Sequence, residues 1–181
     1  FLERSSRLAP PDGRPLVLTA VAEKATERAI ASGIPADLLT DAPAHLVASP
    51  DIDIVVETMG GAEPAHTLVA AALAAGKSVV TANKHIVANH GPELERLARA
   101  SDATFRFEAA VGGGIPLLSP IAQDLAANRI SRVRGIVNGT TNYILTAMTR
   151  EGRDYAEVLA EAQAKGYAEA DPTADVEGMD A

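Results

Sequence analysis

Cysteine and tryptophan are missing from this 181-residue chain, and aromatic residues make up only 3% of it. Without cysteine there are no disulfides, no thiolate zinc sites and no cysteine nucleophile. Apolar runs of membrane-spanning length are also missing, and the opening residues lack the pattern of a signal peptide. Basic residues are outnumbered, with a net charge of −8, and form no stripe suited to nucleic acid. We therefore expect a cytoplasmic protein with no nucleic-acid or membrane partner.

The composition is that of a globular protein, with 47% apolar and 22% charged residues. A chain of this length has room for one domain, or for one domain and part of another. The first residues, Phe1 to Arg4, show neither an initiator Met nor a helix cap, and Val176 to Ala181 read as the interior of a helix. We interpret the sequence as a fragment cut at both ends.

Apolar strand-like segments alternate with helix-like segments in the first two thirds of the chain. Such alternation predicts βαβ units and a parallel sheet with right-handed crossovers. The fold class is therefore α/β, an incomplete Rossmann-like doubly wound parallel sheet. The expected strands are 15–22, 53–57, 77–81 and 103–108, and the expected helices are 24–32, 64–75 and 92–100.

From Gly112 the pattern changes, and the run GGGIP is typical of a junction between domains. Helices are expected at 116–127, 142–150 and 154–165, with a strand at 130–137. We predict a partial nucleotide-binding domain at 1–112 and part of an α+β catalytic and dimerisation domain at 113–181.

Three loops follow predicted strands, where parallel sheets bind ligands. The glycines of TMGGAEP either make a tight turn or let backbone N–H groups approach a ligand. Lys84 of TANK is either a solvated loop residue or a group that moves protons or anchors a ligand. Glu108 and the glycines of EAAVGGGIP form either a hinge or a set of oxygen ligands for a hard cation.

Two further stretches stand near the C-terminus. NGTTNY opens a helix, with Thr140 or Thr141 as a natural N-cap, and free N–H groups there also attract a carboxylate. GYAEADPTADVEGMDA has five carboxylates and no Lys or Arg, so it is either a solvated acidic tail or a site for a cation. Asp171 and Pro172 suit a helix start, but capping explains neither Glu169 nor Asp180.

VVTANK, FEAAVGGGIP, GIVNGTTNYIL and GYAEADPTADVEGMDA occur in this order and resemble motifs of homoserine dehydrogenase. The similarity runs from about Ile52 to the end, and residues 1–50 are similar to the divergent early part of the family's nucleotide domain. The resemblance implies NAD(P)-dependent interconversion of L-homoserine and L-aspartate 4-semialdehyde, on the route to threonine and methionine, by a homodimer.

The resemblance also implies roles for single residues. Lys84 would contact nicotinamide and substrate and assist proton transfer, and Glu169 and Asp180 would bind the amino and hydroxyl end of homoserine through charge-assisted hydrogen bonds. The implied cofactor residues are Thr58, Gly60, Lys84 and Gly166, the further substrate residues are Gly139 and Thr140, and the monovalent cation (Na⁺) residues are Glu108, Val111, Gly113 and Ile115.

Departures from the family pattern leave alternatives. The family's Gly-rich phosphate loop would precede residue 1, and its second lysine would fall at position 184, so we expect this piece alone to be inactive. Glu23 suits a ribose 2′-hydroxyl and Lys24 a 2′-phosphate, which leaves both NAD and NADP open. The rival functions are a non-catalytic metabolite-binding module and part of a bifunctional aspartate kinase–homoserine dehydrogenase. Aspartate-semialdehyde dehydrogenase is excluded because it needs a cysteine nucleophile.

Overall fold

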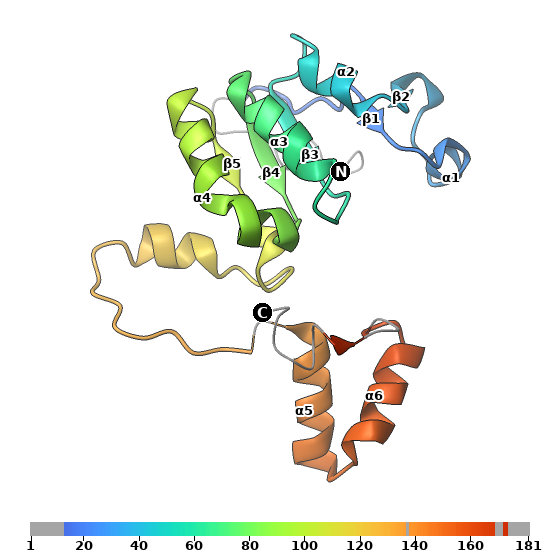
Figure 1. Cartoon of the computed structure of the whole chain (residues 1–181), viewed down its shortest axis with the longest axis vertical. Helices are drawn as coiled ribbons and strands as arrows, with labels where there is room; N and C mark the ends of the chain where they lie inside the picture. Colours follow the sequence, from blue (N-terminus) through green and yellow to red (C-terminus); the bar gives the residue numbers. More distant parts are fainter. Residues whose placement is uncertain (1–12, 137, 169–171, 174–181) are drawn as a thin grey trace. The chain divides into compact units, whose positions relative to one another are not determined.

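The computed structural model of the chain describes residues 13–136, 138–168 and 172–173 (Figure 1). The chain divides between Arg106 and Phe107 into two compact units. Among the described residues, no helix combines the length and apolar character needed to cross a membrane.

The first unit is built on parallel strands, which confirms the predicted α/β class. Its three-stranded sheet has the order β3 (Ile54–Glu57), β4 (Ser78–Thr81) and β5 (Phe105–Arg106), with every pair parallel. A second parallel pair joins β1 (Val21–Ala22) to β2 (Leu39–Thr40). The register of β3 and β4 matches Glu57 with Thr81, so both strands end at the same edge of the sheet.

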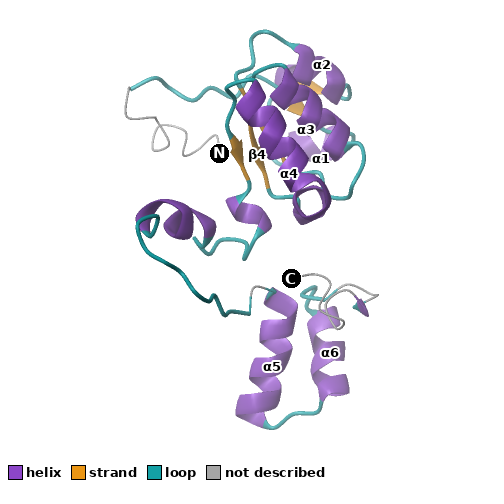
Figure 2. Cartoon of the chain, turned by 60° about the vertical axis from the view of Figure 1, so that its left-hand side comes forward, coloured by secondary structure: helices purple, strands orange, loops and turns teal. Residues whose placement is uncertain are grey.

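Helices α3 (Ala65–Ala74) and α4 (Lys84–Ala100) pack on one face of the three-stranded sheet (Figure 2). Val55, Val79 and Phe105 point to this face and are buried, together with side chains of both helices. Ile54 and Val56, on the other face of β3, are exposed. Side chains alternate between the faces of a strand, and the described helices cover one face only.

The predicted helix at 92–100 begins earlier than expected, at Lys84. Pro92 matched the pattern of a first helical residue, yet it lies inside α4. An interior proline costs about 3 kcal/mol because it removes a backbone hydrogen bond. Ile86 and Leu94, fully buried on either side of it, offset that cost by packing into the core.

The N-terminal part of the unit differs most from prediction. The strand expected at 15–22 forms only over its last two residues, and α1 spans Thr26–Ala31. Three elements that were not predicted follow: the 3₁₀ helix η2 (Ala36–Leu38), the strand β2 and the helix α2 (Pro43–Ala48). Elements of two to six residues are too short to show a hydrophobic period, so the sequence pattern gave no signal for them.

The regular elements among the described residues of the second unit are all helical. They form η3 (Glu108–Ala110), η4 (Pro120–Asp124), α5 (Gly139–Glu151) and α6 (Tyr155–Ala164). Helices α5 and α6 pack through Ile144, Ala147, Val158 and Ala162. The helix expected at 116–127 corresponds to η4, which is shorter than predicted.

The strand expected at 130–137 does not form over residues 130–136. Ile130, Val133 and Ile136 are exposed there. A strand needs a neighbour to pair its backbone groups, and none of the described residues of this unit supplies one.

Candidate functional site

A buried carboxylate joins the ends of β3 and β4. Glu57 is 4% exposed, and its Oε2 accepts a hydrogen bond from Thr81 Oγ1 at 2.5 Å. Its Oε1 accepts from the backbone N–H of Met59 at 2.7 Å. A buried carboxylate needs such donors, because an unpaired buried charge is costly. Glu57 therefore fixes the first turn of the loop that leaves β3.

Asn83 extends this network to helix α4. Its Oδ1 accepts from the N–H groups of His85 and Ile86, which makes it the N-cap of the helix. Its Nδ2 donates to the carbonyl of Gly61 at 2.8 Å, and its own N–H donates to Thr81 Oγ1 at 2.9 Å. One side chain thus starts α4 and holds the loop after β3.

The loop after β3 has the properties of a ligand-binding turn. Gly60 and Gly61 have φ of 75° and 73°, which glycine adopts without strain. Thr58 and Gly60, both expected at the cofactor, are exposed at the carboxyl end of β3. The glycines leave the backbone open on this side, as a closely approaching ligand requires.

Lys84 is the first residue of α4 and is exposed. A solvated loop residue was one of the two alternatives for Lys84, but the Asn83 cap makes it part of the helix start. Because Glu57 and Thr81 are in register, Lys84 and the loop at Thr58–Gly61 leave the same edge of the sheet. The structure therefore brings together the residues that the sequence indicated in this unit.

Glu23, one of the two residues relevant to cofactor choice, follows β1. Its N–H donates to Thr40 O at 3.0 Å, and its Oε1 accepts from the N–H of Ala25 at 2.9 Å. Its carboxylate therefore caps the turn before α1, at the carboxyl end of the β1–β2 pair. Carboxylates have about four acceptor positions, so this bond leaves acceptor capacity for a ribose hydroxyl.

In the second unit, the Glu108 carboxylate accepts hydrogen bonds from several backbone N–H groups. Its Oε1 accepts from the N–H groups of Leu117 and Leu118, and its Oε2 accepts from the N–H and Oγ of Ser119. The Ser119 hydroxyl is the main reason why the pKa of Glu108 falls to about 2. The carboxylate thus caps the turn that begins the helical segment containing η4.

The predicted cation residues follow Glu108 along the backbone. Gly112 and Gly113 have φ of 73° and 61°, and Ile115 is exposed. The N–H of Val111 donates to Glu108 O, and that of Ile115 donates to Gly112 O, both at 3.2 Å. The segment is therefore a pair of successive tight turns.

Thr140 links the start of α5 to the chain that leaves α6. Its hydroxyl is part-buried and donates to Tyr167 O at 2.5 Å. Tyr167 follows Gly166, whose φ of 74° makes the turn at the end of α6. Thr140, Gly139 and Gly166, all expected near substrate or cofactor, are thus associated in one unit.

The N-cap of α5 is Asn138, not Thr140 or Thr141 as predicted. Its Oδ1 accepts from the N–H of Thr141 at 2.7 Å. Asparagine is as good a cap as threonine or better, and choosing it begins the helix at Gly139. The cap leaves the Thr140 hydroxyl for the contact with Tyr167.

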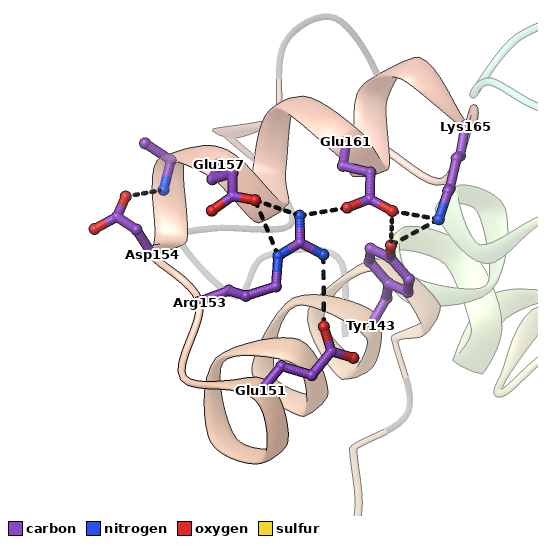
Figure 3. Close-up of polar contacts among 8 residues, drawn as sticks. Tyr143, Glu151, Arg153, Asp154, Glu157, Glu161 and Lys165 are labelled. Atoms are coloured by element: carbon purple, nitrogen blue, oxygen red, sulfur yellow. Dashed lines mark hydrogen bonds and ion pairs between the residues drawn. The ribbon is translucent and has the colours of Figure 1, made fainter.

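An ion-pair cluster joins α6 to α5 and to the loop between them (Figure 3). Glu161 Oε1 accepts from Tyr143 Oη at 2.7 Å and from Lys165 Nζ, and its Oε2 lies 2.5 Å from Arg153. Lys165, Tyr143 and Arg153, in that order, lower the pKa of Glu161 to about 2. The same contacts raise the pKa values of Lys165 and Arg153.

Glu169 and Asp180, the predicted homoserine ligands, lie outside the described residues. Sequence reasoning missed Glu57, Thr81, Asn83, and the cluster around Glu161. The sequence did contain a signal for Glu57, because a carboxylate that ends an otherwise apolar strand needs hydrogen-bond donors when it is buried.

Two protein-family models match this chain, and curated relatives share about half of its residues. The family model "Homoserine dehydrogenase, NAD binding domain" matches residues 2–108, and the model "Homoserine dehydrogenase" matches residues 116–181. A homoserine dehydrogenase of Mycobacterium tuberculosis is 53% identical over the whole chain, and one of Synechocystis is 49% identical over 96% of it.

Solved structures give the same result. The chain is similar to a homoserine dehydrogenase from Thiobacillus denitrificans, with 48% identity, 99% of this chain covered and a TM-score of 0.85. It is also similar to a hyperthermophilic archaeal homoserine dehydrogenase in complex with NADPH, with 36% identity, 76% of this chain covered and a TM-score of 0.68. The chain spans 41% of the Mycobacterium tuberculosis and Thiobacillus denitrificans proteins and 43% of the archaeal one.

Proposed function

This chain belongs to the homoserine dehydrogenase family, and we propose that it supplies the cofactor site and part of the substrate site of an NAD(P)-dependent enzyme that interconverts L-homoserine and L-aspartate 4-semialdehyde. The observation that carries the proposal is the buried network of Glu57, Thr81 and Asn83. It holds the loop Thr58–Gly61 and the start of α4 at one sheet edge.

The residues at this edge fit a dinucleotide. Glycines with positive φ allow a ligand to approach the backbone closely, and ligands of parallel sheets bind at the carboxyl ends of the strands. The NADPH complex of the archaeal relative supports this choice. In this proposal Thr58 and Gly60 line the nicotinamide side of the cofactor, and Gly166 keeps the cofactor role that the family resemblance implies. When bound, the cofactor accepts or donates the hydride.

Lys84 is proposed to handle the proton of the reaction. Oxidation of homoserine removes a hydride from the hydroxyl-bearing carbon and a proton from the hydroxyl, leaving the aldehyde. Lys84 is exposed at the helix start, where its amino group can reach a bound ligand. A positioned acid or base of this kind contributes about 100- to 10,000-fold in rate.

The substrate is held, in this proposal, by the second unit. The ammonium group of homoserine pairs with Glu169 and Asp180 through charge-assisted hydrogen bonds. Gly139 and Thr140 lie at the N-terminus of α5, where a substrate carboxylate is favoured. The hydrogen bond from Thr140 to Tyr167 supports this arrangement, because it ties the helix start to the chain that leads to Glu169.

The proposed Na⁺ site uses fewer ligands than the resemblance implies. The Glu108 carboxylate does not fit a ligand role, because its oxygens already accept four hydrogen bonds from Leu117, Leu118 and Ser119. Main-chain carbonyls are the oxygen ligands that remain, and we propose those of Val111, Gly113 and Ile115. No chemical step is assigned to the ion.

Three further properties are proposed from the family and the composition: a homodimer, a cytoplasmic location and no nucleic-acid partner.

For the cofactor we propose NAD or NADP without preference, because Glu23 retains acceptor capacity for a ribose 2′-hydroxyl and Lys24 is adjacent to it. Titration of the chain with NADH and NADPH, and then of a Glu23→Gln variant, would separate the two. Selective weakening of NADH binding in the variant supports the role of Glu23.

The function is tested in a chimaera in which this chain replaces the matching segment, 41% of the length, of the Mycobacterium tuberculosis relative. Absorbance follows homoserine-dependent reduction of NAD and NADP. We expect turnover that is lost in a Glu169→Ala variant and kept in an Asp175→Asn control. A folded chimaera that binds NADPH but does not oxidise homoserine would contradict the proposal and favour a binding module.

A further inference from the structure

Two histidines and a carboxylate converge between α3 and α4, on the helical side of the first unit. His66 lies on α3, and His90 and Glu93 lie on α4. One potential ligand atom from each falls within 4.8 Å of the other two. None of these residues belongs to the proposed cofactor or substrate site.

His66 is oriented as metal-binding histidines usually are. Its Nδ1 lies 3.3 Å from Glu63 Oε1, and a carboxylate only accepts hydrogen bonds. In the tautomer that donates from Nδ1 to Glu63, the lone pair of His66 is on Nε2. Glu63 is itself held by the hydroxyl of Thr67 at 2.8 Å. A carboxylate that fixes the tautomer in this way is a frequent partner of a ligating histidine.

The lone pair of His66 has no hydrogen-bond partner. Nε2 is buried, and among the described residues it is the one buried side-chain nitrogen or oxygen with no hydrogen bond. Buried polar atoms without a partner are rare and point to a missing water or ion. Nε2 lies 3.5 Å from Glu93 Oε2, too far for a hydrogen bond but close enough for both atoms to bind one ion.

The two α4 residues complete the set. His90 and Glu93 are three positions apart, which puts them on one face of the helix. Glu93 Oε2 lies 3.6 Å from His90 Nδ1. Ligands about 2.1 Å from a tetrahedral zinc ion lie roughly 3.4 Å from each other, close to both measured distances.

The rings of His66 and His90 are stacked, with centroids 3.8 Å apart and an angle of 19°. An ion shared by both histidines lies in the plane of each ligating ring, so binding requires the part-exposed His90 ring to turn out of this stack. Part of the cluster is open to solvent, since the His90 and Glu93 side chains are 35% and 44% exposed. An ion can therefore enter, and water can fill the fourth position.

We propose that His66, His90 and Glu93 form a site for a divalent transition-metal ion, with zinc as the expected occupant. Two imidazoles and one carboxylate suit zinc, whereas the hard ions Mg²⁺ and Ca²⁺ prefer all-oxygen sites. The ion would tie α3 to α4. These helices follow the loop Thr58–Gly61 and residue Asn83, so the site stabilises the fold around the proposed cofactor edge.

The test measures zinc binding by the untagged 181-residue chain with isothermal titration calorimetry. We expect one equivalent bound, no binding of Mg²⁺, and a melting temperature raised by roughly 5–10 °C at a zinc concentration about 100 times Kd. His66→Ala, His90→Ala and Glu93→Gln should each abolish the shift. The matched control is His45→Asn, which alters an exposed histidine on α2 and should leave binding unchanged.

Cobalt gives a readout that does not depend on stability. Co²⁺ bound to the chain should show the visible absorption of a four-coordinate ion, and this absorption should disappear in His90→Ala. Glu63→Ala, which removes the partner of His66 Nδ1, should weaken zinc binding about 10- to 100-fold. Circular dichroism of the metal-free variants confirms that each is folded.

Three results would overturn the proposal: no zinc binding, equal loss of binding in His45→Asn, or equal binding of Mg²⁺ and Zn²⁺. A pH-dependent melting temperature without any metal effect would also overturn it, and would assign the cluster to an imidazolium–carboxylate ion pair. The test uses neither NAD(P) nor homoserine, so its failure leaves the proposed dehydrogenase function intact.

Discussion

Glu57 and Thr81 end neighbouring parallel strands and are joined by a 2.5 Å hydrogen bond between their side chains. Glu57 also accepts from Met59, and the Thr81 hydroxyl accepts from the N–H of Asn83. The pair therefore links the loop after β3 to the start of α4. The geometry of the proposed cofactor site depends on this buried contact.

Replacing Thr81 with valine tests that contact. Valine keeps the shape but removes the hydrogen-bond donor to Glu57 Oε2, so we expect a loss of about 1–3 kcal/mol in the free energy of unfolding. Urea unfolding of the chain measures it. Because the residues share one interaction, Glu57→Gln in the same chain should add less than its separate effect. Strict additivity would show that the contact contributes nothing.

Asn83→Ser separates the two tasks of Asn83. Serine is an equally good N-cap but has no group to donate to Gly61 O. We expect stability to change by less than about 0.5 kcal/mol, whereas NADPH binding, followed by fluorescence, becomes weaker. Asn83→Ala should lower both stability and binding. Unchanged NADPH affinity in Asn83→Ser would mean that the Gly61 contact does not shape the cofactor loop.

The cluster at Glu161 predicts acid sensitivity of the second unit. The folded pKa of Glu161 is about 2, against an ordinary value of 4.5. A lowered folded pKa means that its contribution is complete above the unfolded pKa and is lost as pH falls through 4.5 towards 2. Helix content across this pH range should fall for the wild-type chain.

Glu161→Gln serves as the comparison in the acid titration. It should lower stability near neutral pH and make the acid transition shallower. Glu108, whose pKa also falls to about 2, contributes in the same window, so Glu108→Gln measures the remainder. Parallel acid transitions in the wild type and in Glu161→Gln would contradict the role of the cluster.

Thr140→Val removes the hydrogen bond to Tyr167 O and leaves that carbonyl without its partner. We expect a loss of about 1–2 kcal/mol in stability and a higher KM for homoserine in the chimaera, with the KM for NADP unchanged. Thr140→Ser keeps the hydroxyl and should restore both values. A KM for homoserine that is unaffected in Thr140→Val would separate this contact from substrate binding.

The sequence was informative where residues repeat with a clear period or form dense motifs. The strands at Ile54–Glu57 and Ser78–Thr81 and the helix ending at Ala164 lie close to their predicted ranges, because short apolar runs and helix-ending residues mark them. Lys84 and the glycine loop at Thr58–Gly61 follow β4 and β3 at the carboxyl end of the sheet, and their functional roles remain predictions.

What the sequence could not indicate was long-range pairing. The strand expected at 130–137 depends on a neighbour that a local pattern does not reveal, and Pro92 appeared to begin a helix that the burial of Ile86 extends backwards. Likewise, no local pattern indicated that three backbone N–H groups would donate to the Glu108 carboxylate. Pairing of residues distant in the sequence decides each of these cases.

The most direct test of the account replaces Lys84 with methionine in the chimaera and measures kcat for homoserine oxidation together with Kd for NADPH. We predict that kcat falls by at least about 100-fold, because the proton loses its carrier. NADPH binding should weaken far less, since the network of Glu57, Thr81 and Asn83 is intact. The control for charge is Arg99→Met, which removes an exposed cation on the same helix and should retain kcat. A Lys84→Met chimaera with wild-type kcat would contradict the proposed role of Lys84 and the function built on it.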